Sequence, residues 1–201
     1  SRRGLGILAF QTGRYELAEE QLLRAAALVP ADAALFTSLG DISAARGEVG
    51  PALERYRRAL ALDPGWVPAL NNLAIANHLQ GRLGEAAAGY ERVLELAAGR
   101  ADGAALRGRT LSNLAEVYLL RGQIAEALAA QTEAHALLPA HEGLASNRLR
   151  TLAYAASAGR REIRDAHAQW WEDYARDITP VVRGGSEVDG AGDRPLRVGM
   201  V

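Results

Sequence analysis

DAALFTSLGDISAARGEVGPALERYRRALALDPG, residues Asp32–Gly65, is followed by a stretch of the same design, and this pair decides the fold. Pro30 and Pro64 lie 34 residues apart. Residue types recur at the same offset in Leu39 and Leu73, Gly47 and Gly81, Ala52 and Ala86, and Tyr56 and Tyr90. A fixed period of this length is typical of helix pairs that stack side by side. We therefore predict an all-α fold, a right-handed α-α superhelix.

The repeated positions have a consistent physical role. Small residues at Ala52, Ala86 and Ala127 allow the two helices of a pair to approach closely, and glycine supplies the positive φ of the turn between them. The Leu-Gly/Ala pair, the turn glycine, the mid-helix alanine, the aromatic and the closing proline together resemble the tetratricopeptide repeat. The resemblance predicts four repeats over residues 1–31, 32–65, 66–98 and 107–140, with a seven-residue insertion after the third that lengthens its connection to the fourth.

The remaining residues predict a different organisation. Residues 141–178 have the spacing of a capping helix pair, with helices over 142–157 and 161–177. Residues 179–194 are a Gly-rich linker, and 195–201 have the composition of a single strand. Because a strand is not stable without a partner, we expect it to begin an α/β domain that lies outside this sequence. The chain is therefore expected to be a fragment of a longer protein.

Three short runs carry a more specific resemblance: residues 146–154 (SNRLRTLAY), 167–170 (HAQW) and 194–199 (RPLRVG). In that order after four repeats, they resemble the junction of bacterial SPINDLY-type, O-linked N-acetylglucosamine transferase-like proteins. The resemblance implies a parent enzyme that transfers a sugar from a nucleotide sugar to Ser or Thr of an acceptor protein. The family's catalytic residues would lie beyond Val201, so this chain is expected to be inactive alone, and whether the whole protein is an enzyme stays open.

Composition excludes several other classes. The net charge is −1, which gives no reason to expect nucleic acid or an anionic membrane as a partner. The chain has no cysteine, which fits a reducing compartment such as the cytoplasm, and its Arg-only, Ala- and Gly-rich composition is typical of GC-rich bacteria. The four histidines are not spaced as metal ligands, so we expect no metal and no cofactor in this chain.

The resemblance also implies a peptide-binding groove. In the family, an asparagine of each first helix lines the groove and hydrogen-bonds the peptide backbone; an amide suits this role because it both donates and accepts. Asn72, Asn113 and Asn147 match that position, and Ser38 replaces the asparagine in the second repeat. Helical geometry adds further candidates on the same side of these helices, namely Asn71, His78, Ser112 and Glu116. The alternative is that the asparagines only bond neighbouring backbone.

The sequence thus favours a protein-binding arm of a protein O-glycosyltransferase, which recruits acceptor proteins and docks on its own C-terminal domain. The alternative is a stand-alone adaptor or scaffold that mediates protein–protein interactions. Adaptors that grip a C-terminal carboxylate use basic residues where this chain has Thr37, Asn71 and Ser112, so that version of the adaptor is disfavoured. Assembly into a homo-oligomer stays open.

Overall fold

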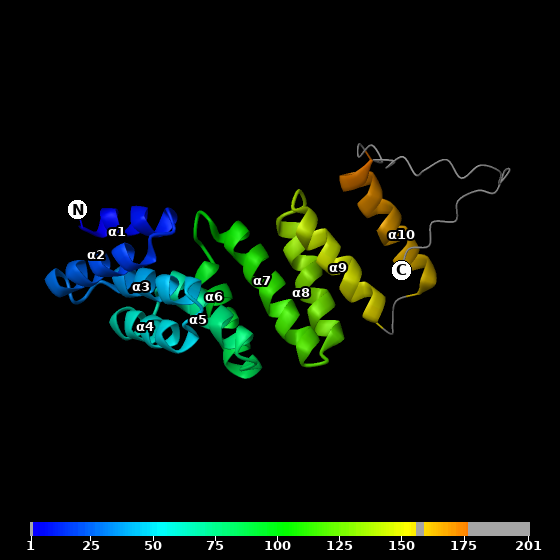
Figure 1. Cartoon of the computed structure of the whole chain (residues 1–201). Coiled ribbons are helices and arrows are strands. Elements are labelled where there is room, and N and C mark those ends of the chain that lie inside the picture. Colours follow the sequence, from blue (N-terminus) through cyan, green and yellow to red (C-terminus); the bar gives the residue numbers. More distant parts are fainter. Residues whose placement is uncertain (1, 156–158, 177–201) are drawn as a thin grey trace, which may run out of the picture.

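The computed structural model describes residues 2–155 and 159–176. These residues form an all-helical solenoid, which confirms the predicted fold class (Figure 1). The predicted linker and C-terminal strand lie outside the described residues. The helices in chain order are α1 (Arg2–Gln11), α2 (Tyr15–Leu28), α3 (Ala33–Ala45), α4 (Val49–Leu62), α5 (Val67–Leu79), α6 (Leu83–Ala97), α7 (Gly103–Leu120), α8 (Ile124–Leu137), α9 (Glu142–Tyr154) and α10 (Arg160–Trp170).

The helices pack as consecutive hairpins that follow one another across the molecule (Figure 1). Among the described residues, every substantial contact joins helices that are neighbours or next-but-one neighbours in the chain. The odd-numbered helices also contact each other in sequence, from α1 to α9, whereas no two even-numbered helices make comparable contacts. The odd-numbered helices therefore lie closer together, on the inner side of the curve, and the even-numbered helices cover the outer side.

The turn within each of the first four hairpins is closed by a glycine in the left-handed region, at Gly13, Gly47, Gly81 and Gly122. At the end of α3, Gly47 has a φ of +77°. Its N–H donates to the carbonyl of Ala44 at 3.0 Å, and the N–H of Glu48 donates to the carbonyl of Ser43 at 2.9 Å. This pair of bonds is a Schellman motif, which satisfies carbonyls that the helix end would otherwise leave free. Gly81 repeats the conformation 34 residues later, with a φ of +71°.

The small and large positions of the repeat fit each other in the core. Ala52 and Ala59 have no exposed surface, and Tyr56 between them is only 2% exposed. The Tyr56 ring lies against Gly40 so closely that a Cβ at Gly40 would come within 2.4 Å of Cε1. The Leu39-Gly40 pair is therefore required because the aromatic ring of the same unit occupies the space of a side chain.

The insertion after the third repeat enters a helix rather than a loop. The sequence predicted a longer connection, but only residues 98–102 separate α6 from α7. Most of the extra length lies in α7, which has 18 residues where α5 has 13. The run of helix formers Ala104, Ala105 and Leu106 explains the difference, because it extends α7 toward its N-terminus.

α10 is attached more loosely than the helices before it. The sequence predicted one helix over 161–177, but α10 ends at Trp170 and residues Trp171–Ala175 continue it as one π-helical turn. No residue of α10 is buried. Trp170 Nε1 donates to Ser146 Oγ of α9 at 3.1 Å, and the Tyr174 hydroxyl of the π-helical turn donates to the carbonyl of Pro139, just before α9.

Candidate protein-binding groove

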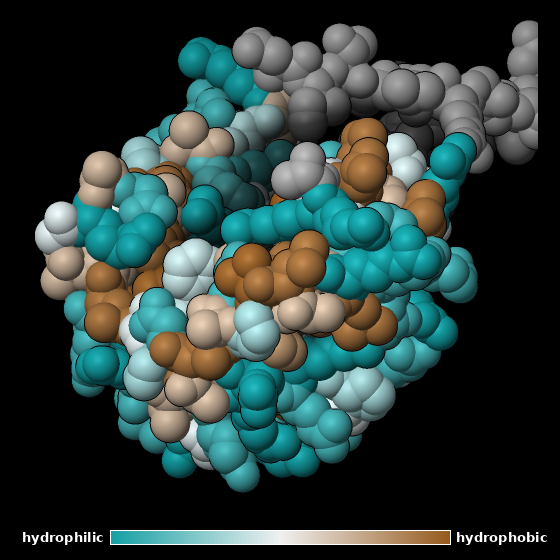
Figure 2. All heavy atoms as spheres, turned by 90° about the vertical axis from the view of Figure 1, so that its left-hand side faces the viewer, coloured by the Kyte–Doolittle hydropathy of each residue, from teal (hydrophilic) through white to brown (hydrophobic). Residues whose placement is uncertain are grey.

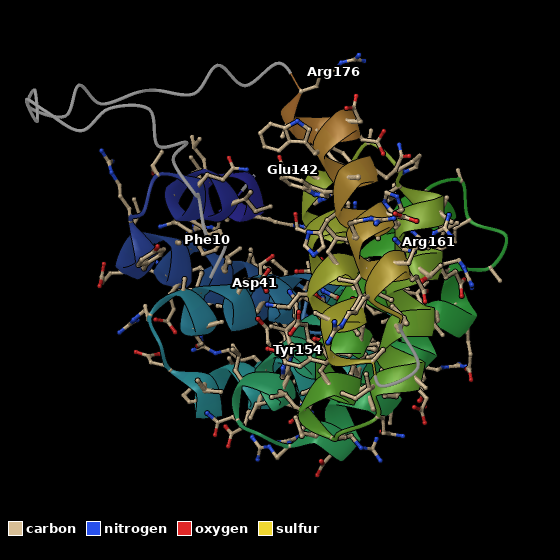
Figure 3. All side chains as sticks on the ribbon, turned by 90° about the vertical axis from the view of Figure 1, so that its right-hand side faces the viewer. Phe10, Asp41, Glu142, Tyr154, Arg161 and Arg176 are labelled. Atoms are coloured by element: carbon tan, nitrogen blue, oxygen red, sulfur yellow. The ribbon has the colours of Figure 1, made fainter. Side chains whose placement is uncertain are left out.

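The inner side of the curve presents both polar and exposed apolar side chains from the odd-numbered helices. Figure 3 looks along the array, and Asp41 of α3 and Tyr154 of α9 both lie on the inner side of the curve that the helices describe. Leu79, Leu120 and Tyr154 end α5, α7 and α9 at equivalent places, and their exposed fractions are 75%, 63% and 67%. Apolar side chains this exposed on a concave surface are typical of a protein-binding site.

A hydrogen-bonded cluster joins the second and third repeats. Asp41 Oδ1 accepts from the Tyr56 hydroxyl at 2.9 Å and from Asn72 Nδ2 at 2.7 Å. Asn72 Oδ1 in turn accepts from Asn71 Nδ2 at 3.2 Å. The cluster thus fixes the side chain of Asn72 across the junction of two units, from α3 to α5.

Burial controls the ionisation of this cluster. Desolvation raises the pKa of Asp41, while the hydrogen bonds from Tyr56 and Asn72 lower it and leave a net upward shift. Desolvation, with the nearby Asp41 charge, raises the pKa of the Tyr56 hydroxyl well above its usual range. Tyr56 therefore remains a hydrogen-bond donor at every physiological pH.

The predicted groove residues are not equally free. Ser38 Oγ donates to the carbonyl of Ala34 in its own helix at 3.0 Å. Asn147 Nδ2 donates to Ser112 Oγ at 3.4 Å, and Glu116 pairs with Arg150. Asn113 and His78, both half-buried, make no side-chain hydrogen bond or ion pair within the described chain. The structure therefore joins Asn72 to Asp41, Ser112 to Asn147 and Glu116 to Arg150, and leaves the Asn113 amide available.

Asp41 and the hydroxyl of Tyr56 were missed as polar groups of this face. In the sequence, Tyr56 is distinguished only as the recurring aromatic of the repeat. A usable signal was present, because Asp41 lies three residues after Ser38, as Ile75 follows Asn72 and Glu116 follows Asn113. Glu116 was a predicted groove residue, and Asp41 is at the equivalent position of the second repeat. The same comparison would therefore have placed Asp41 on the groove.

Beside this cluster lies a pocket of about 250 Å³ between the second and third repeats. Its apolar wall consists of Ala44, Val49, Ala52, Ile75, Ala76 and Leu79. Asp41, Tyr56 and Asn72 supply the polar wall, and Asp41 is the one charged residue that lines it. The volume is smaller than the pockets that hold cofactors or drug-sized molecules.

In the part of the chain that the structure describes, no three His, Asp or Glu side chains are grouped so that they could hold a metal ion. The Gly4–Ala9 segment, whose glycines loosely match a phosphate-binding pattern, lies inside α1 with Gly6 packed on Leu22. No described helix is long and apolar enough to cross a membrane.

Comparison with known proteins agrees with this architecture. The tetratricopeptide-repeat family model matches residues 67–140. No curated protein matches the sequence. The residues of the third and fourth units are therefore tetratricopeptide repeats.

Solved structures share the fold over most of the chain. MamA from Desulfovibrio magneticus RS-1 superposes with a TM-score of 0.76 at 16% identity, over 89% of this chain and 96% of that chain. PilF of Pseudomonas aeruginosa gives a TM-score of 0.72 at 26% identity, over 87% of this chain and 74% of that chain. SycD, a type III secretion translocator chaperone of Yersinia enterocolitica, gives 0.57 at 25% identity, over 60% and 83%. The chain therefore has the tetratricopeptide-repeat fold.

Proposed function

We propose that this array binds an extended segment of a partner protein along its inner face. The observation that carries the proposal is the row of exposed Leu79, Leu120 and Tyr154 beside a line of amides, of which Asn113 has no partner in the described chain. Apolar side chains supply buried area, and the amides supply hydrogen bonds to a peptide backbone irrespective of its sequence. Asn72 contributes through its second amide hydrogen and the second acceptor site of Oδ1, because Asp41 and Asn71 occupy one donor and one acceptor site of the group.

A peptide-library selection against the immobilised chain tests this proposal. The affinities of the selected peptides are then measured for Asn113→Ala and for the control Gln80→Ala, which removes an exposed amide from the turn after α5. Loss of one or two backbone hydrogen bonds should weaken binding to Asn113→Ala by about five- to tenfold. If the selected peptides bind Asn113→Ala as tightly as the parent chain, the groove assignment is wrong.

We further propose that the partner is the acceptor protein of a nucleotide-sugar-dependent O-glycosyltransferase, with this array as its recruiting arm. The support is the resemblance of residues 146–154 and 167–170 to the junction in that enzyme family; the third run, residues 194–199, lies outside the described residues. Holding the acceptor near the catalytic domain would accelerate transfer by proximity. A stand-alone adaptor or scaffold is equally consistent with the fold.

The two versions differ in what the full-length protein does. With a labelled nucleotide sugar and a bound partner protein, the full-length protein should label the partner, and deletion of residues 1–140 should abolish this labelling but not hydrolysis of the nucleotide sugar. Residues 1–201 alone should transfer no sugar. A full-length protein that binds its partner but consumes no nucleotide sugar would be an adaptor.

A further inference from the structure

The pocket beside Asp41 has an unusual combination of walls. Most of its lining is aliphatic, from Val49, Ile75 and Leu79 among others, yet one carboxylate faces it. Only one oxygen of that carboxylate is satisfied, since Tyr56 and Asn72 both donate to Oδ1. Oδ2 makes no hydrogen bond or ion pair with any described residue.

The side chain that fills this pocket must match both walls. An aliphatic side chain would suit the apolar wall, but it would bury the Asp41 carboxylate without a compensating charge, and burial of an unpaired charge costs free energy. A neutral polar side chain would satisfy Oδ2 and leave the apolar wall unfilled. A long side chain with a methylene stem and a cationic end satisfies both walls, because the stem lies along the aliphatic residues while the charge reaches the carboxylate.

We propose that this pocket is the specificity site of the groove and receives a lysine or arginine side chain of the bound segment, with Asp41 Oδ2 as the acceptor. This inference rests on the proposed groove function and adds to it the residue class that the second and third repeats select. Asn72 has two roles here: it orients the Asp41 carboxylate from α5, and it lies beside the peptide backbone that would carry the basic residue.

The test uses the same library selection, run in parallel on the parent chain, Asp41→Asn and Glu54→Gln. Asp41→Asn keeps an Oδ1 acceptor for Tyr56 and Asn72 but removes the charge. Glu54→Gln makes the same change of charge at an exposed residue of α4 that lies outside the pocket and pairs with no described residue. Cooperative thermal unfolding of all three proteins, at temperatures no lower than that of the parent chain, shows that folding is intact.

We expect peptides selected on the parent chain and on Glu54→Gln to carry Lys or Arg at one fixed position, and those selected on Asp41→Asn to lose this enrichment. Replacing that residue by norleucine, which keeps the stem of lysine without the ammonium, should weaken binding to the parent chain at least about fivefold, or about 1 kcal/mol. The same replacement should change the affinity for Asp41→Asn by less than about twofold.

A second variant addresses the pocket itself. Ala44 is exposed and lines the pocket, so Ala44→Leu should fill it and weaken the lysine peptide. Ala61→Leu makes the same change at an exposed residue of α4 outside the lining and should not weaken it. Selected peptides without a basic position, or a basic preference that persists in Asp41→Asn, would overturn this inference and leave groove binding intact. If the parent chain selects no peptide at all, both the groove proposal and the pocket proposal are wrong.

Discussion

At the scale of single residues, the inner face depends on Asp41, whose carboxylate is partly buried and shared between two donors. Burial raises the pKa of this carboxyl in the folded chain, so folding favours its protonated form. Its ionised form therefore costs stability at neutral pH, and the cost is absent below the unfolded pKa, where the group is protonated in both states. Retention of a destabilising charge is typical of functional sites rather than of structural ones.

The sign of this effect gives a first prediction. Asp41→Asn should be slightly more stable than the parent chain at pH 7, because the variant does not bury a charge. The difference should shrink as the pH falls through the raised folded pKa and vanish below 3.8, the ordinary pKa of an aspartate side chain. Urea unfolding of both proteins across this range measures it, and a variant less stable than the parent at pH 7 would contradict the assigned cause of the shift.

The contact between Gly40 and the Tyr56 ring gives a second prediction. A methyl at Gly40 would overlap the ring, so Gly40→Ala should lower the free energy of unfolding by about 1–3 kcal/mol. Gly50 is also helical but has no atom within 4 Å of a built Cβ. Gly50→Ala should therefore leave stability unchanged or raise it by up to about 1 kcal/mol. Chemical denaturation distinguishes the two, and equal effects at both glycines would argue against the close packing of Tyr56.

At the scale of elements, the helices differ in how firmly they are held. Gln131 of α8 stands where α4 and α6 have Tyr56 and Tyr90. Its amide is buried, and neither Oε1 nor Nε2 has a partner in the described chain. An unsatisfied buried amide destabilises a fold, so the fourth unit is less well packed than the second. The last helix, α10, has no buried residue and is the least firmly packed of the described helices.

Local unfolding should therefore begin at α10. In native-state hydrogen exchange, amides of α10 should exchange at a free energy several kcal/mol below those in the centre of α5. Trp170→Phe removes the bond to Ser146 Oγ and should lower protection in α10 while leaving α5 unchanged. Protection of α10 equal to that of α5 would show that the pair is an integral part of the array.

Most helices could be predicted from the period because each unit repeats its own turn glycine and core residues. Three features could not. The extension of α7 depends on how far a helix propagates into Ala104–Leu106, and the two glycines nearby suggest a loop. The π-helical turn after Trp170 carries Tyr174, whose hydroxyl bonds the carbonyl of Pro139, 35 residues away, and no local pattern contains that contact. The role of Asp41 depends on Asn72, 31 residues away in the next unit, so no local pattern contains it.

At the scale of the whole molecule, one end of the array presents an apolar surface. Figure 2 faces the N-terminal end and shows apolar side chains gathered there among hydrophilic ones. Leu5, Leu8 and Leu17 are 58%, 58% and 42% exposed. In the next unit, residues equivalent to Leu5 and Leu8 are Leu39 and Ile42, which are 1% and 0% exposed because the preceding pair covers them. The same repeat position is thus core or surface according to its neighbour.

Comparing equivalent leucines measures this dependence. Leu39→Ala should lower the free energy of unfolding by about 2–5 kcal/mol, because it leaves a cavity between two units. Leu5→Ala, at the same position of the first unit, should change it by less than about 0.5 kcal/mol. Denaturant unfolding of the two variants provides the measurement. Similar losses at both positions would mean that the N-terminal surface is covered in solution.

The restriction of contacts to adjacent and next-but-one helices has a mechanical consequence. No described contact ties one end of the array to the other, so a tensile force applied between the ends passes through each junction in series. Such a chain of junctions behaves as a spring, with gradual elastic extension at low force and release of one hairpin after another at higher force. The weakly held α10 would detach first, and the groove between the second and third repeats would keep its shape until higher force.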